Sequence, residues 1–330
     1  MKAVWYDRQG PAQEVLCFGE LPTPEPGPGE VRVRLYASAV NPADANRRAG
    51  RLHGMDYPRI IPNSDGAGVI DAVGKGVNSD LLERRVWLHF GQRGRAFGTA
   101  AEYICLPSEL AAPLPDQVEF IEGACLGIPA MTAYCSLFLD GPIEGKTVLV
   151  TGGAGAVGHY AVQLAKWGGA RVVTTVSSAE KAAHARRGGA HEVVDYTKDD
   201  VAERILDFTA GKGVDRIVDV DAIGNMKLGF QVAAEHATWV SYAIGPDSAE
   251  ALPIVSLIRR NLSLRGLYLS GMPIEVRRQV QSGIGRWLAE APDAVHAVDR
   301  SFSLRDTAQA HLAVEEGSKV GTVIVRCDRV

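Results

Sequence analysis

Hydrophobic and polar residues alternate strictly over residues 31–35, near the start of the chain. Alternation with a period of two is typical of a strand that buries one face. Short apolar segments of similar length follow at 67–74, 85–88 and 101–104. Strands at this spacing predict a β-barrel-like module over residues 1 to about 120.

The pattern changes from residue 120 onward, where helix-like and strand-like segments begin to alternate. Residues 121–139 are largely apolar and predict helices that lead into a buried, β-branched strand at 147–151. Further strands are predicted at 171–176, 192–194, 214–220, 238–242 and 262–269, and helices at 179–187, 201–209 and 226–234. This alternation is typical of a parallel sheet covered by helices on both faces. The last segments predict helices near 274–290 and 307–316 and a strand at 321–325.

A glycine-rich turn directly follows the strand at 147–151 and matches the pattern G-x-G-x-x-G. After it, apolar residues recur at the spacing of one helical face. Glycines between a strand and a helix let the backbone approach a pyrophosphate, and the helix N-terminus supplies N–H donors. We therefore predict a dinucleotide site; the alternative is a tight connection without a ligand. Its residues are Gly153, Ala154, Gly155, Ala156, Val157 and Gly158.

The composition is that of a globular protein, with 330 residues of which 46% are hydrophobic and 22% charged. A single core seldom exceeds roughly 250–300 residues, so we expect two domains. The net charge of −4 argues against a general nucleic-acid-binding surface. No apolar segment approaches the ~20 residues of a membrane span, and the N-terminus does not resemble a signal peptide. Five scattered cysteines without a C-x-x-C pattern favour free thiols and a cytoplasmic location.

Four motifs together point to one family: VNPAD at 40–44, PNSDGAGV at 62–69, GIPAMTAY at 127–134 and the glycine turn. The chain resembles, nearly end to end, the zinc-free medium-chain dehydrogenases/reductases of the quinone oxidoreductase branch, which includes zeta-crystallin. The resemblance implies an α/β fold in which a Rossmann doubly wound parallel sheet is inserted into a GroES-like β-barrel substrate domain. It places the substrate domain at 1–122 and 270–330 and the dinucleotide-binding domain at 123–269. It also implies a homodimer or a homotetramer.

The tip of the second strand in the alternating part carries Ser177 and Ser178 and no acid. An acid there would bind the ribose 2′-hydroxyl of NADH and repel a 2′-phosphate, whereas hydroxyls can donate to the phosphate. Lys181, one helical turn on, can add a charge-assisted contact. The resemblance also places Ser177, Lys181 and Tyr196 around this phosphate, so we expect NADPH rather than NADH. A structural interpretation, compatible with this one, is that Ser177 caps a helix and Lys181 lies on a solvated face.

The resemblance also implies that the chain holds no metal. Zinc-dependent relatives carry cysteine, histidine and cysteine ligands where this chain has Asn41, Ser64 and Ile128. Their four-cysteine lobe corresponds to residues 88–110, which contain only Cys105. Because zinc requires three or four converging ligands, we expect no metal site at these positions.

Without a Lewis acid to polarise an alcohol, the expected substrates are already electron-poor: a quinone or an α,β-unsaturated carbonyl. The protein then has to position the acceptor and stabilise the charge that develops on its oxygen. Asn41 is expected to donate an amide hydrogen to an oxygen or to the nicotinamide, and Asp44 to orient a neighbour or a ribose. Alternatively, Asn41 belongs to a turn and Asp44 caps the following helix. The predicted catalytic residues are Asn41, Asp44, Asn46 and Ser64.

Further predicted cofactor contacts come from the alternating part of the chain. Thr132 resembles the family's contact near the nicotinamide, and open α/β sheets bind ligands at the carboxyl ends of their strands. The residues predicted to line the cofactor side of the cleft, at the carboxyl ends of the strands, are Tyr242, Ala243, Ile244, Leu267, Tyr268 and Leu269. The chain departs from the family at Asn46, where quinone reductases often carry a tyrosine. The adjacent Arg47 and Arg48 leave room for an anionic or bulkier acceptor.

Three functions stay open from the sequence. The first is an NADPH-dependent quinone or enone reductase that acts on a small molecule and takes its second proton from water. The second is an enoyl-thioester reductase in which Arg47, Arg48 and Arg51 contact a carrier phosphate. The third is a non-catalytic NADPH-binding protein, since relatives include lens structural proteins and RNA binders; the net negative charge speaks against RNA.

Overall fold

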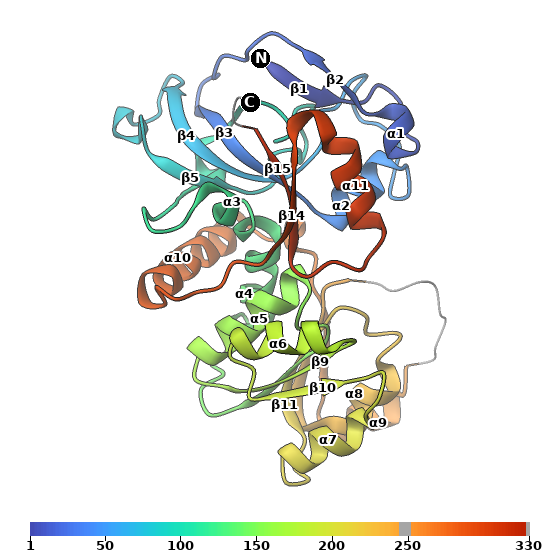
Figure 1. Cartoon of the computed structure of the whole chain (residues 1–330). Coiled ribbons are helices and arrows are strands. Elements are labelled where there is room, and N and C mark those ends of the chain that lie inside the picture. The colour runs from blue at the N-terminus through green and yellow to red at the C-terminus, as the bar shows by residue number, and fades with distance from the viewer. Residues whose placement is uncertain (244–251, 328–330) are drawn as a thin grey trace. The chain divides into compact units, whose positions relative to one another are not determined.

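The structure, a computed structural model, describes residues 1–243 and 252–327 (Figure 1). The chain divides into two compact units, Met1–Ile128 with His296–Val330, and Pro129–Val295. The two ends of the chain thus belong to one unit, and the middle of the chain forms the other. The domain ranges inferred from the resemblance stay a prediction; the compact units differ from them mainly over residues 270–295, which belong to the second unit.

The first unit is built on a seven-stranded sheet in the order β14-β15-β3-β4-β5-β7, with β6 also paired to β3. The strands are β3 (Glu30–Val40), β4 (Asp65–Val73), β5 (Arg85–Leu88), β6 (Tyr103–Pro107), β7 (Ala111–Pro113), β14 (Val298–Ser303) and β15 (Thr322–Arg326). Along β3, Val31, Val33 and Leu35 are buried while the residues between them are not. The strand predicted from alternation is therefore confirmed.

The C-terminal segment completes this unit because β15 pairs with β3 antiparallel, with Ile324 opposite Ala39. A separate pair is formed by β1 (Lys2–Trp5) and β2 (Cys17–Glu20). The helices of the unit are α1 (Ala12–Val15), α2 (Pro42–Arg48), α3 (Phe120–Gly123) and α11 (Thr307–Glu315). The predicted terminal helix and strand are thus confirmed to within one residue at each end.

The second unit holds a six-stranded parallel sheet in the order β10-β9-β8-β11-β12-β13. Its strands are β8 (Thr147–Val150), β9 (Arg171–Val176), β10 (Glu192–Asp195), β11 (Val214–Asp219), β12 (Ala233–Ser241) and β13 (Ser263–Gly266). In chain order this is 3-2-1-4-5-6, the order of a Rossmann sheet. The predicted α/β fold class is confirmed.

The helices of the second unit are α4 (Met131–Phe138), α5 (Ala156–Trp167), α6 (Ala179–Arg187), α7 (Val201–Phe208), α8 (Met226–Val232), α9 (Ile254–Arg260) and α10 (Ile274–Glu290). In the core, Leu149, Val173 and Ile217 from three adjacent strands pack with Ile205 of α7 and Trp239. Burial of the strands on both faces explains why they are continuous apolar segments. None of the helices in the described ranges is long and apolar enough to cross a membrane.

The last strand of this sheet is shorter than predicted. Residues 262–269 were expected to form it, but β13 ends at Gly266. Leu267 keeps one contact with the sheet, from its N–H to the carbonyl oxygen of Ser241 at 2.7 Å, and Leu269 already begins a short 3-10 turn. Leu267 and Leu269 are buried, whereas Tyr268 is 74% exposed. Leu267 and Leu269 are therefore buried by packing and not by strand pairing.

Candidate active site

The turn between β8 and α5 carries the predicted dinucleotide site. Gly152 lies in the left-handed region, with φ 66°, and Gly155 directly precedes α5. The N–H of Gly152 donates to the Thr175 hydroxyl and the N–H of Gly153 to the Thr175 carbonyl oxygen, both at 3.1 Å. The chain thus passes from β8 into α5 through one tight turn that is anchored to β9.

Two glycines of this turn have no room for a side chain. A Cβ on Gly153 would overlap the hydroxyl of Thr174, and a Cβ on Gly158 would overlap the carbonyl oxygen of Gly152. Gly155 differs, because a Cβ there would meet only that same carbonyl oxygen, at 3.4 Å, among the described residues. The first N–H groups of the 12-residue helix α5 also lack intrahelical partners. An unobstructed backbone at a helix N-terminus fits a dinucleotide pyrophosphate.

Gly158→Ala is expected to lower the free energy of unfolding by about 1–3 kcal/mol, because its methyl group has to push the turn open. Dinucleotide affinity should fall with it. Gly155→Ala is the matched variant: it should unfold at the parental temperature and still bind the dinucleotide more weakly, since its methyl group takes up space in front of the backbone. Thermal denaturation and fluorescence titration with the dinucleotide measure the two effects. Parental stability of Gly158→Ala would contradict the tight turn.

The end of β9 carries the residues predicted to bind a 2′-phosphate. Lys181 Nζ donates to Ser177 Oγ at 3.0 Å, and the N–H of Tyr196 donates to the carbonyl oxygen of Val176 at 3.0 Å. These contacts bring Ser177, Lys181 and Tyr196 together at one edge of the sheet. Ser178 Oγ accepts from the N–H of Lys181 at 3.2 Å and so caps α6. The interpretation in which Ser177 is the cap is therefore wrong, and the Ser177 hydroxyl is not needed to hold the helix.

In the first unit, two buried carboxyl groups join the predicted catalytic residues. Ser64 Oγ donates to Asp44 Oδ1 at 2.7 Å, and the N–H of Asn41 donates to Asp44 Oδ2 at 2.9 Å. The amide nitrogen of Asn41 donates to Asp65 Oδ2 at 2.7 Å, and the N–H of Ile128 donates to the same oxygen at 2.8 Å. The structure thus brings three of the four predicted catalytic residues together. It adds Asp65, which the sequence analysis did not select.

The contact between Asp44 and the N–H of Asn41 stabilises the start of α2. Asn41 precedes the helix and Asp44 is its third residue, so the predicted helix cap is confirmed. The carboxylate of Asp44 accepts from Ser64 as well, with its second oxygen. One side chain therefore stabilises the helix and positions a predicted site residue at the same time.

Burial raises the pKa of both carboxyl groups in this cluster. For Asp44 the effect of burial is opposed by hydrogen bonds from Ser64 and from the N–H of Asn41. For Asp65 burial raises the pKa well above its usual range, and the negative charge of Asp44 raises it further. Asp65 is 0% exposed and Asn41 is 4% exposed. Both residues of this contact are therefore buried, and Asp65 lies entirely inside.

A second hydrogen-bond network is centred on Asn63, which directly precedes Ser64 in the chain. Asn63 has a left-handed backbone, with φ 74°. Its amide nitrogen donates to Ser38 Oγ at 3.0 Å, and its Oδ1 accepts from His311 Nε2 at 3.0 Å. His311 is fully buried on α11, and burial lowers its pKa to about 3, so the neutral ring is the donor. No local pattern in the sequence could have linked His311 to a residue so far away in the chain.

Two arginines near Asn46, Arg48 and Arg51, form ion pairs with Glu315. Arg48 is 1% exposed and pairs with Glu315 of α11 at 2.9 Å. Arg51 pairs with the same carboxylate at 3.2 Å and donates to Asn46 Oδ1 at 3.1 Å. The interpretation in which Arg48 contacts a carrier phosphate is therefore wrong, because its guanidinium is buried in this ion pair. Asn46 is held by Arg51 and makes none of the hydrogen bonds of the carboxyl cluster.

The remaining predicted cofactor residues belong to the second unit. Thr132 is buried within α4. Tyr242 and Ala243 directly follow β12, and the N–H of Tyr242 donates to the carbonyl oxygen of Asp219 at 3.1 Å. Ile244 lies outside the described residues. Tyr242 and Ala243 therefore lie at the carboxyl end of a strand, as the prediction requires. Contact of Thr132, Tyr242 and Ala243 with a cofactor stays a prediction.

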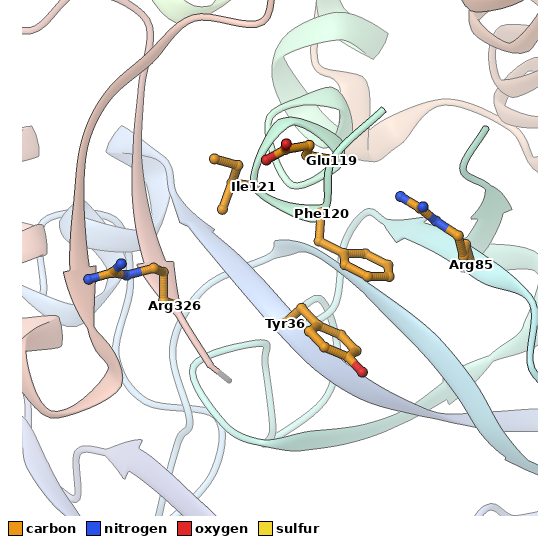
Figure 2. Close-up of a pocket in the computed structure, with 6 residues that line it drawn as sticks. All are labelled: Tyr36, Arg85, Glu119, Phe120, Ile121 and Arg326. Carbon is orange, nitrogen blue, oxygen red and sulfur yellow. The ribbon is translucent and has the colours of Figure 1, made fainter. Parts of the chain in front are cut away.

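A surface pocket of about 280 Å³ in the first unit contains none of the predicted site residues (Figure 2). Its floor is the pair Tyr36 and Phe120, whose rings stack with centroids 4.4 Å apart. The guanidinium of Arg85 lies over the Phe120 ring at 4.5 Å and donates to backbone carbonyls, which fixes it to the fold. The pocket therefore does not mark the site that the sequence predicts.

Comparison with known proteins identifies the family. Residues 27–116 match the family described as "Alcohol dehydrogenase GroES-like domain", and residues 156–283 match "Zinc-binding dehydrogenase". A quinone oxidoreductase of Pseudomonas aeruginosa is 30% identical over 315 residues, which cover 94% of this chain and 95% of the relative. The chain belongs to the quinone oxidoreductase family of medium-chain dehydrogenases/reductases. The predicted family is confirmed.

Other proteins that are similar to this chain differ in name and in cofactor. A 2-haloacrylate reductase of a Burkholderia species is 31% identical over 338 residues, with 98% of each chain covered. A solved NAD-dependent alcohol dehydrogenase has a TM-score of 0.91 and 30% identity, over 99% of this chain and 100% of the other. A mycobacterial protein solved with NADPH has a TM-score of 0.84 and 28% identity, with 99% and 100% covered. Family membership alone therefore leaves both cofactor and acceptor to be decided by this chain's own residues.

In this member of the quinone oxidoreductase family, the positions that correspond to zinc ligands do not fit a metal. Asn41 and Ile128 direct N–H groups to Asp65, and Ser64 directs its hydroxyl to Asp44. Residues 1–243 and 252–327 contain no group of three or more His, Cys, Asp or Glu side chains suited to hold a metal ion. The expectation that the enzyme works without metal stays a prediction, and it rests on the chemistry of these donors.

Proposed function

We propose that this member of the quinone oxidoreductase family is a cytoplasmic, NADPH-dependent enzyme that transfers a hydride to a quinone or an α,β-unsaturated carbonyl without a metal. The observation that carries the proposal is the Asn41 amide, which donates one of its two N–H groups to a buried carboxyl group at 2.7 Å and keeps the second for an acceptor. A positioned amide donor can stabilise charge on an acceptor oxygen where no Lewis acid is present. The relatives named quinone oxidoreductase and 2-haloacrylate reductase support acceptors of this kind.

In this proposal, NADPH supplies a hydride from C4 of its nicotinamide when it is bound. The glycine turn and the N-terminus of α5 bind the pyrophosphate, and Ser177 and Lys181 bind the 2′-phosphate. Asn41 donates its amide hydrogen to the acceptor oxygen, where negative charge develops. Neutral amides and hydroxyls do not readily supply a proton near pH 7, so the proton that completes the reduction comes from water.

Binding of NADPH in preference to NADH is expected to depend on Lys181. Lys181→Ala should reduce the ratio of the two affinities by about tenfold to a hundredfold, because a charge-assisted hydrogen bond contributes roughly 1.5–3 kcal/mol. Fluorescence titration with both dinucleotides gives the ratio. Lys212→Ala is the control: Lys212 is exposed, in the loop that enters β11 at the amino end of the same sheet, and should leave the ratio unchanged. Equal affinities in the parent would contradict the proposed preference.

One assay separates the proposed activity from its alternatives. NADPH oxidation is followed in parallel with 1,4-benzoquinone, 9,10-phenanthrenequinone, crotonaldehyde and crotonyl-CoA. Turnover of the quinones or of crotonaldehyde supports the proposal. Turnover of crotonyl-CoA alone identifies an enoyl-thioester reductase, and NADPH binding without any turnover identifies a non-catalytic protein.

An oligomer of this chain belongs to the same proposal, as a homodimer or homotetramer. Strand β13 is an edge of the parallel sheet, and α9 precedes it in the chain. Large apolar side chains on these two elements are exposed, namely Ile254, Val255, Ile258 and Leu264. Contact with a second copy would cover them. All five cysteines are free thiols, which is compatible with the reducing cytoplasm of the proposal.

A further inference from the structure

Asp65 is the more deeply buried of the two carboxyl groups in the cluster with Asn41 and Ser64, and its two oxygens differ. Oδ2 accepts from the amide of Asn41 at 2.7 Å and from the N–H of Ile128 at 2.8 Å. Oδ1 is buried and has no hydrogen-bond partner among the residues that the structure describes. Gly127 lies directly against Oδ1, so closely that a Cβ on this glycine would overlap the carboxyl group. The carboxyl group is thus locked in place, with one oxygen in use and the other enclosed.

A carboxyl group that makes no contact with solvent cannot bind the acceptor itself. Its contact with Asn41 nevertheless decides where that amide can point. A primary amide nitrogen carries two hydrogens in the plane of the amide, and the bond to Asp65 uses one of them. The plane and the direction of the second N–H are then fixed. Without this bond the direction of the second N–H is no longer fixed by the carboxyl group, and a misplacement of about 1 Å at a reacting group costs up to about 10²-fold in rate.

We propose that Asp65 is a positioning residue for the reduction, which aims the second N–H of the Asn41 amide at the oxygen of the acceptor. This proposal rests on the proposed function, in which Asn41 donates to that oxygen. It adds a residue that does not touch substrate or cofactor and that acts only through Asn41. It also explains why position 127 is a glycine, since any side chain there would displace the carboxyl group from Asn41.

The geometry also indicates in which protonation state Asp65 positions the Asn41 amide. An ionised carboxylate would leave charge on Oδ1, which is enclosed without a donor and close to the carboxyl of Asp44. A neutral carboxyl with its proton on Oδ1 avoids that charge and keeps Oδ2 as an acceptor. The raised pKa of Asp65 agrees with this form. Asparagine has the same shape as the neutral carboxyl and can present its carbonyl oxygen to Asn41 and Ile128 in the same way.

The test compares Asp65→Ala and Asp65→Asn with Asn41→Ala and with the double variant Asn41→Ala/Asp65→Ala, in enone reduction at saturating NADPH. Asp65→Ala should lower kcat by up to about 10²-fold with the Kd for NADPH unchanged. Asp65→Asn should keep kcat within about fivefold of the parent, because the asparagine carbonyl oxygen can still accept the hydrogen bond from Asn41. The double variant should be no slower than Asn41→Ala, since Asp65 acts only through that residue. Asp65→Ser, whose shorter side chain withdraws the carboxyl oxygen from Asn41, is measured alongside in case Asp65→Ala does not fold.

The outcomes separate this inference from the proposed function. A parental rate for Asn41→Ala contradicts the role of Asn41 and thus the proposed function. A slow Asn41→Ala with a parental rate for folded Asp65→Ala or Asp65→Ser contradicts the positioning role of Asp65 alone. So does a double variant in which the two losses multiply, because the residues then act independently. If Asp65→Asn loses as much rate as Asp65→Ala, the claim that Asp65 accepts from Asn41 as a neutral carboxyl group is contradicted.

Discussion

Alanine in place of Asn41 is expected to lower kcat for an enone by about 10²–10³-fold and to leave the Kd for NADPH unchanged. The loss of one preorganised donor to a developing oxyanion typically has this effect. Affinity for NADPH should persist, because the proposed pyrophosphate and 2′-phosphate contacts come from the glycine turn and from the end of β9. Steady-state kinetics with crotonaldehyde and fluorescence titration with NADPH measure the two quantities.

One control variant and one labelling experiment accompany the Asn41→Ala measurement. Asn78→Ala removes an asparagine of the same unit that caps a short surface turn, accepting from the N–H of Asp80 at 3.0 Å, and should turn over at the parental rate. In the parent, NADPH deuterated at C4 should deliver its label to the enone product. If Asn41→Ala reduces the enone as fast as the parent, the assigned role is wrong. Loss of the label to solvent would contradict direct hydride transfer.

Elements with a local period could be predicted from the sequence. The alternation at 31–35 lies within β3, and the helix predicted near 274–290 is α10. In both, the pattern follows from the geometry of one element and needs no knowledge of its neighbours. The end of β13 is different. Leu267 and Leu269 are apolar because other elements bury them, so their hydrophobicity extended the predicted strand beyond its last pairing residue, Gly266.

The candidate site could be predicted only where a motif or the resemblance carried it. Asn41, Asp44 and Ser64 were selected in this way, and the structure joins them by hydrogen bonds. Asp65 stands next to Ser64 in the same motif and was missed. Its part in the site depends on strand register: β4 pairs with β3 so that Asp65 lies opposite Ala39, two residues before Asn41. Register between distant strands is a tertiary property that no local pattern records.

A similar limit applies to the serines at the end of β9. Ser177 and Ser178 have the same side chain, and either could cap a helix. Only the backbone conformation, extended at Ser178, makes that residue the cap and leaves Ser177 to meet Lys181. The sequence could therefore indicate a hydroxyl-rich tip without an acid, but it could not assign the two roles.

Asp219→Ala is expected to lower the free energy of unfolding of the Rossmann unit by about 3–5 kcal/mol, which corresponds to a melting temperature roughly 10 °C lower. Asp219 ends β11 and is fully buried. Its carboxylate accepts from Thr151 Oγ at 2.6 Å, from Asn225 Nδ2 at 2.8 Å, from Trp239 Nε1 at 2.9 Å and from the N–H of Asp221 at 3.0 Å. Alanine leaves these donors without an acceptor, and thermal denaturation measures the cost.

The control lies at the other end of the same strand. Among the described residues, Asp215 accepts one hydrogen bond, from the N–H of Thr147 at 2.7 Å, so Asp215→Ala should cost only about 1 kcal/mol. Asp219→Ala should also lower the affinity for NADPH. Thr151 directly precedes the glycine turn, and its hydroxyl accepts from the N–H of Val220 while it donates to Asp219. Without the carboxylate, the ends of β8, β11 and β12 lose these side-chain hydrogen bonds, so Asp219→Ala should bind NADPH more weakly than Asp215→Ala. Equal melting temperatures for the two variants would contradict this account of the carboxyl edge of the sheet.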